Sequence, residues 1–170
     1  SIAREEARRD SIARAEQMRR AREDSLARAR AREDSLRRVR EETEAVRAMI
    51  ARMVHFDFDK SDIRPGEDTE VLQEKLAILQ ANPSLSIEIT GHCDERGSDE
   101  YNIALGNRRA LSARQFLIDR GIAESRIAVR SMGESQPIDP GHNEDAWAKN
   151  RRDEFRITGG GDVLKRPSGM

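Results

Sequence analysis

Aromatic residues, cysteine and long apolar runs are all scarce in this chain of 170 residues. Only 4% of the residues are aromatic, and the one cysteine, Cys93, cannot form an intramolecular disulfide, so cysteine usage does not indicate a redox compartment. No stretch approaches the roughly 18 to 20 apolar residues of a membrane-spanning helix, and no secretory signal peptide is recognisable. Because 37% of the residues are charged, a core requires the apolar residues to be concentrated in one part of the chain.

Charge and glycine content divide the chain into two parts. Residues 1–53 hold fifteen Arg, no Lys and eleven acidic residues, a net charge of +4, whereas the remainder carries −5. Glycine and proline are absent from the first 64 residues, and Ala, Arg, Glu and Leu dominate up to about Met53. Acidic residues recur four positions before an arginine, a spacing that supports a helix. Residues 1–53 are therefore predicted to form one long, charged helical stalk.

Three interpretations of this stalk remain open. It contains an imperfect Asp-Ser-Ile/Leu repeat at residues 10–12, 24–26 and 34–36, whose unequal intervals exclude a solenoid. The first interpretation is a solvated spacer, and the second is a dimeric or trimeric coiled coil near residues 36–53, hence a homo-oligomer. The third, an arginine-rich nucleic-acid arm, is disfavoured because acids nearly balance the arginines and no aromatics interleave. The candidate seam, with spacings of 3 and 4, is Leu36, Val39, Thr43, Val46, Ile50 and Met53.

The remaining residues alternate between strand and helix patterns. "VHFDFD" places Val54, Phe56 and Phe58 on one face of a first strand. The α/β (α+β) order β-α-β-α-β-α-β over residues 54–159 predicts a two-layer sandwich with helices on one side. Residues 160–170 have little apolar content and are predicted to be a disordered tail. The further expected strands are 85–90, 126–131 and 154–158, and the expected helices are 65–81, 98–120 and 143–152.

An acidic and a basic residue are expected to converge where the second strand meets the next helix. Asp94 follows the strand in a loop turned by Gly97, and Arg109 lies on the helix that Ser98 caps. Side by side, a carboxylate and a planar guanidinium suit a zwitterion such as an α-amino acid group. The alternative is a structural salt bridge between the two. The helix is expected to turn Ile103, Gly106, Ala110, Ala113 and Leu117 towards the core, with Asn102, Leu105 and Arg109 at its margin.

Three segments carry a family resemblance. "FDFDKSDIRP", "GHCDERGSDEYNIALGNRRA" and "AWAKNRRDEF", in this order, resemble the OmpA-like C-terminal domain family and, within it, the peptidoglycan-associated lipoproteins. The resemblance implies noncovalent binding of peptidoglycan in the periplasm, with Asp94 and Arg109 gripping the diaminopimelate residue of the stem peptide. It assigns supporting positions to Asn102, Leu105, Phe58 and Asp59.

The same resemblance implies a setting and partners. It implies association with the outer membrane through an N-terminal lipid anchor that this chain does not contain, and TolB as a partner in a Tol-Pal system. The alternative is a structural coiled-coil spacer, or another OmpA-like stalked lipoprotein, in which wall binding is secondary. No nucleic acid, cofactor or metal is expected.

An enzyme is not expected either. His92-Cys93-Asp94 could suggest a thiol nucleophile or a metal site, but the chain's histidines and Cys93 are scattered without ligand spacing. A catalytic thiol also needs a positioned base, and neighbours at a strand end point to opposite faces. Cys93 is therefore predicted to be a small packed residue.

Overall fold

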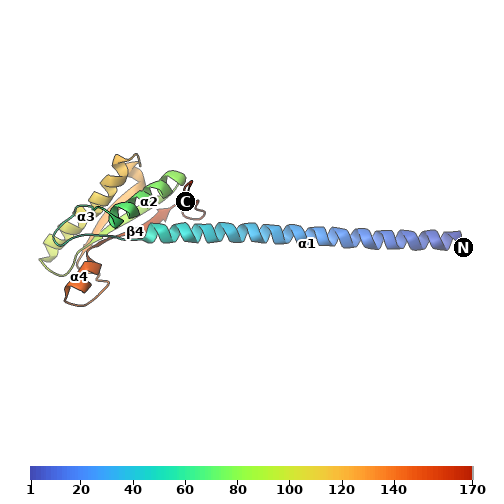
Figure 1. The fold of residues 1–170 in the computed structure, drawn as a ribbon, viewed down its shortest axis with the longest axis horizontal. Helices are drawn as coiled ribbons and strands as arrows, with labels where there is room; N and C mark the ends of the chain where they lie inside the picture. Colours follow the sequence, from blue (N-terminus) through green and yellow to red (C-terminus); the bar gives the residue numbers. More distant parts are fainter. Residues whose placement is uncertain (170) are drawn as a thin grey trace. The chain divides into compact units, whose positions relative to one another are not determined.

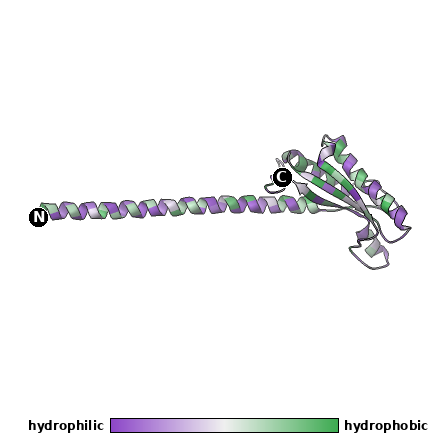
Figure 2. Cartoon of the chain, turned by 180° about the vertical axis from the view of Figure 1, so that it is seen from behind, coloured by the Kyte–Doolittle hydropathy of each residue, from purple (hydrophilic) through white to green (hydrophobic). Residues whose placement is uncertain are grey.

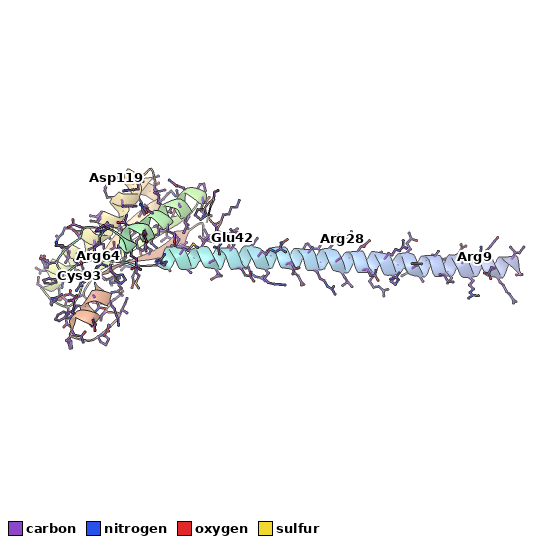
Figure 3. All side chains as sticks on the ribbon, in the orientation of Figure 1. Arg9, Arg28, Glu42, Arg64, Cys93 and Asp119 are labelled. Atoms are coloured by element: carbon purple, nitrogen blue, oxygen red, sulfur yellow. The ribbon has the colours of Figure 1, made fainter. Side chains whose placement is uncertain are left out.

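The computed structural model describes residues 1–169 and divides into two compact units, Ser1–Glu41 and the residues from Glu42 onward. Helix α1 (Ile2–Ala51) forms the first unit, and its last turns belong to the second. Along the first unit the side chains extend into solvent around the helix (Figure 3). Within the described residues, no helix combines the length and the apolarity needed to cross a membrane.

The second unit is a four-stranded sheet with the strand order β1-β4-β2-β3. β2 pairs in parallel with β3 and antiparallel with β4, and β1 pairs antiparallel with β4. Helices α2 and α3 lie together on one face of the sheet (Figure 1), which confirms the predicted α/β sandwich. Its elements are β1 (Val54–His55), α2 (Glu67–Ala81), β2 (Ser86–His92), α3 (Asp99–Asp119), η1 (Glu124–Arg126), β3 (Ile127–Gly133), α4 (Glu144–Asn150) and β4 (Arg152–Gly159).

The core lies between the sheet and α2 and α3, where the hydrophobic residues concentrate (Figure 2). Two glycines allow α3 to approach β2 closely, because a Cβ at Gly91 would lie 1.7 Å from the carbonyl oxygen of Gly106. The caps of α3 are as predicted: Ser98 accepts a hydrogen bond from the backbone of Tyr101, and the chain leaves the helix through Gly121 at φ +104°. This close contact sets how near α3 lies to the end of β2.

The first strand is shorter than predicted. Phe56 is buried, but Phe58 is 53% exposed and Asp59 has a φ of +59°. The strand cannot continue because the carbonyl groups of Asp57 and Lys60 accept hydrogen bonds from Arg109. The chain therefore turns here, and Phe58 lies outside the core.

The predicted core face of α3 was also wrong in part. Ile103 is 48% exposed, whereas Asn102, Leu105 and Arg109 are buried. Periodicity assigned the polar residues to the margin, but Asn102 and Arg109 find hydrogen-bond acceptors inside the fold. Their burial places polar groups beneath the surface from the first turn of α3 to its middle.

The stalk boundary and the tail also differ from the prediction. Thr43, Val46 and Ile50 of α1 are buried in the second unit, so half of the proposed seam is unavailable to a second helix. The tail is ordered over residues 160–169, because Leu164 is 1% exposed and its backbone N–H donates to Thr43. Lys165 and Asn82 exchange two further hydrogen bonds. One buried leucine and these backbone contacts are enough to dock a segment of low overall apolarity.

Candidate functional site

A pocket of about 210 Å³ opens where β2 ends and α3 begins. Its lining contains all six residues that the sequence singled out, which are Phe58, Asp59, Asp94, Asn102, Leu105 and Arg109. Cys93, Arg96, Gly97 and Tyr101 complete the wall. Side chains from the turn after β1, the loop after β2 and helix α3 therefore meet in one cavity.

Arg109 forms the buried wall of the pocket. Its Nε donates to the carbonyl oxygen of Lys60 at 2.8 Å, and its two terminal nitrogens donate to His92 at 2.9 Å and Asp57 at 3.1 Å. Burial lowers the pKa of Arg109 from its ordinary value. Within residues 1–169, no carboxylate oxygen lies within 4.0 Å of the guanidinium. Three of its five N–H groups thus donate to backbone carbonyls and orient the guanidinium, and the other two can donate to another acceptor.

Asp94 does not pair with Arg109, so the salt-bridge alternative fails. Instead Arg96 grips the Asp94 carboxylate through Nε at 3.1 Å and a terminal nitrogen at 2.9 Å, and the Arg96 backbone N–H adds a bond of 3.0 Å. Arg151 stands 3.7 Å away. Burial opposes ionisation of Asp94, but the hydrogen bonds from Arg96 outweigh it and lower the pKa. Asp94 is therefore an ionised carboxylate that Arg96 fixes in position in the wall of the pocket.

Arg96 is itself held by two aromatic rings. Its guanidinium carbon lies 3.8 Å from the ring centre of Phe58 and 4.1 Å from that of Trp147 on α4. Glu95 accepts a hydrogen bond from the Trp147 indole at 3.3 Å and lies 2.7 Å from His142 Nδ1. Arg96 and Trp147 were not predicted from the sequence as site residues. The available signals were an arginine two residues after Asp94 and the only tryptophan of the chain.

The mouth of the pocket is bordered by polar contacts. The Tyr101 hydroxyl donates to the Asp59 carboxylate, which links α3 to the turn after β1. Asn102 donates to the backbone of Arg96 and to Glu134 at 3.0 Å. These bonds fix the loop that carries Asp94 against the first turn of α3.

Cys93 is buried, as predicted, and its thiol donates to the carbonyl of Asn102 at 3.2 Å. Burial raises its pKa to about 11, and burial lowers the pKa of the neighbouring His92 to about 4. At neutral pH the thiol is protonated and His92 is uncharged. This pair has the charge state of packed residues, not of an ion-paired nucleophile and base.

The model of the OmpA family matches residues 55–151 of this chain. The chain belongs to the OmpA family. It is 42% identical over 99 residues to the peptidoglycan-associated lipoprotein of Pasteurella multocida (58% of this chain, 65% of that protein). It is 43% identical over 99 residues to that of Haemophilus influenzae (58% of this chain, 64% of that protein). The matches thus span less than two thirds of the length of these relatives.

A solved structure agrees in fold. The crystal structure of the peptidoglycan-associated lipoprotein from Burkholderia pseudomallei superimposes with a TM-score of 0.61 at 36% identity, covering 63% of this chain and 90% of that one. The region matched by the OmpA family model contains the whole lining of the pocket. The candidate site is therefore part of the family domain and not of the stalk.

Proposed function

We propose that this chain binds peptidoglycan noncovalently in the periplasm by holding the diaminopimelate residue of a stem peptide in the pocket between Asp94 and Arg109. The observation that carries the proposal is that these two groups of opposite charge line one cavity without pairing with each other. The relatives supply the ligand class, since they are named for their association with peptidoglycan.

The chemistry of the pocket fits the free amino acid end of diaminopimelate. Its carboxylate would accept hydrogen bonds from the two N–H groups of Arg109 that do not donate to carbonyl oxygens. Its ammonium would approach the Asp94 carboxylate, whose ionised form Arg96 stabilises. Leu105 and Phe58 offer apolar surface to the methylene chain, while Asn102 and Asp59 fix the surrounding loops.

The wider setting belongs to the same proposal. Similarity to the peptidoglycan-associated lipoproteins favours association with the outer membrane and docking of TolB, and a cell-wall link of this kind requires no reaction. A pull-down of TolB by the full chain, with and without soluble stem peptide, tests the partner separately from the wall.

The test of ligand binding uses conservative variants, because both residues are buried. Asp94→Asn keeps the shape of the side chain and removes its charge. Arg109→Lys keeps the charge and removes the planar guanidinium with its several N–H donors. Each is expected to weaken titrated binding of diaminopimelate and cosedimentation with isolated sacculi about ten- to a hundredfold, since one charge-assisted contact contributes roughly 1.5 to 3 kcal/mol.

Arg108→Ala is the matched control, because Arg108 is the exposed neighbour of Arg109 on the same helix. It should bind like the parent chain. Unfolding is measured in parallel, because replacing the Arg109 guanidinium leaves three carbonyl groups without their hydrogen-bond donor. Full binding by folded Asp94→Asn and Arg109→Lys would overturn the proposal.

A further inference from the structure

A repeat of 18 residues runs through the exposed part of α1. Residues 16–23, "EQMRRARE", and residues 34–41, "DSLRRVRE", are the same charged unit displaced by 18 positions, and Arg4, Glu5 and Glu6 recur as Arg22, Glu23 and Asp24. Eighteen residues make five full turns at 3.6 residues per turn, so equivalent side chains return to the same face of a straight helix. A heptad repeat drifts around such a helix and requires a supercoil instead.

The repeat builds a ladder of charges along one face. In each unit a pair of arginines lies between an acid three or four residues before it and an acid three or four residues after it. Arg19 contacts Glu16 at 3.4 Å and Glu23 at 2.9 Å, and Arg20 contacts Glu16 at 3.5 Å. In the second unit Arg37 contacts Asp34 at 3.1 Å. These bonds lie within the helix and need no partner.

An apolar seam is missing from the same residues. The larger apolar side chains Ile12, Met18, Leu26 and Leu36 are all more than half exposed. Continued towards the N-terminus from Leu36, the 3-and-4 spacing of a coiled-coil seam includes Met18 but misses Ile12 and Leu26, and its other positions hold Ala, Ser and Arg. Figure 2 shows hydrophobic and hydrophilic residues intermixed along this segment in the view drawn. Of the candidate seam, Thr43, Val46 and Ile50 are buried in the chain's own domain, so only Leu36 and Val39 precede it as exposed apolar positions.

We infer that residues 1–41 are a single, self-sufficient α-helix that stays monomeric and serves as a straight spacer about 60 Å long. Its stability comes from the 18-residue charge ladder, in contrast to a coiled coil, which is stabilised by apolar contacts between chains. This function is independent of the proposed peptidoglycan site, because it depends only on residues outside the family domain.

Two measurements on the full chain test the inference. Sedimentation velocity over a wide concentration range should give the mass of one chain throughout. Hydrogen–deuterium exchange of peptides from residues 4–41 should become faster in molar salt, which screens exposed ion pairs, while peptides from the sheet stay protected. A mass that rises to that of a dimer or trimer, or exchange that is insensitive to salt, would overturn it.

Two matched variants distinguish stabilisation by the charge ladder from stabilisation by an apolar coiled-coil seam. Removing the ladder acids together (Glu16→Gln, Glu23→Gln, Asp34→Asn and Glu41→Gln) should accelerate exchange in residues 4–41 by roughly three- to tenfold. Leu36→Ala combined with Val39→Ala should leave mass and exchange unchanged, because these side chains contact solvent. The reverse pattern, with fast exchange only in the Leu36 and Val39 variant, would establish a coiled coil.

Discussion

Single residues in the pocket are held by neighbours that come from distant parts of the sequence. Asp94 and Arg109 could be predicted to converge because a strand end, a glycine turn and a capped helix follow each other within a short segment. The position of Arg96 could not be predicted, since it depends on contacts with the rings of Phe58 and Trp147, which are distant in the sequence. The sequence thus predicted that Asp94 and Arg109 meet in the pocket. The structure adds that Arg96 orients the Asp94 carboxylate.

Asp153 is another buried carboxyl, close enough to Arg109 for their charges to interact. It lies opposite Gly91 of β2 and Val54 of β1, on the core face of β4, and its oxygens have no hydrogen-bond partner within residues 1–169. Burial raises its pKa well above the ordinary value, although the positive charge of Arg109 opposes this. The unfolded chain therefore ionises Asp153 at a lower pH than the folded chain does, and folding becomes less favourable as pH rises above about 4.

Asp153→Asn should consequently raise the free energy of unfolding, and its advantage over the parent should grow with pH. The growth is about 1.4 kcal/mol per pH unit between the unfolded and folded pKa values of Asp153. Urea unfolding of both chains at a series of pH values from 4 to neutral measures the difference. A difference that stays constant with pH would mean that Asp153 ionises equally in both states.

At the scale of elements, the alternation of strands and helices was predictable, but the close approach between elements was not. Apolar spacing, Ser98 and Gly121 predicted α3 to within a residue. The same spacing assigned Ile103 to the core and Arg109 to the margin, because periodicity does not register hydrogen bonds to carbonyl groups. Spacing assigned Gly106 to the core face of α3, but the sequence did not indicate that Gly91 would be its partner, and their contact sets the distance of α3 from β2.

Gly91→Ala should therefore displace α3 and the Arg109 that it carries. The new Cβ would meet the Gly106 backbone, which cannot rotate away as a side chain can, so the loss of stability should be about 3 kcal/mol, at the upper end for overpacking. Chemical unfolding measures the loss, and binding of diaminopimelate should weaken in the folded variant. Thr90→Ala, on the opposite face of the same strand, is the control. Equal stability of the parent and Gly91→Ala chains would mean that the contact between Gly91 and Gly106 does not set this distance.

At the scale of the whole molecule, the domain is larger than its family match. Residues 55–151 match the family model, yet the compact unit also contains the end of α1 and the tail. Lys75 of α2 donates to the carbonyl groups of Met49 and Ile50. The last carbonyl groups of a helix have no partner within it, so a residue of the domain provides hydrogen bonds for the C-terminal end of α1. The predicted boundary at residue 53 followed the change in composition, whereas the contacts place it at Glu41 and Glu42.

Leu164→Ala tests whether the tail is a structural part of this unit. Leu164 is fully enclosed, packs in the core cluster that includes Val46 and Ile50, and is fixed by the hydrogen bond from its backbone to Thr43. Truncation should lower the free energy of unfolding by about 2 to 4 kcal/mol, the usual result for a buried leucine. Val163→Ala, at the exposed neighbouring position, should change it little. If both variants unfold like the parent chain, the tail contributes nothing to the core, and the disorder predicted from its composition is correct after all.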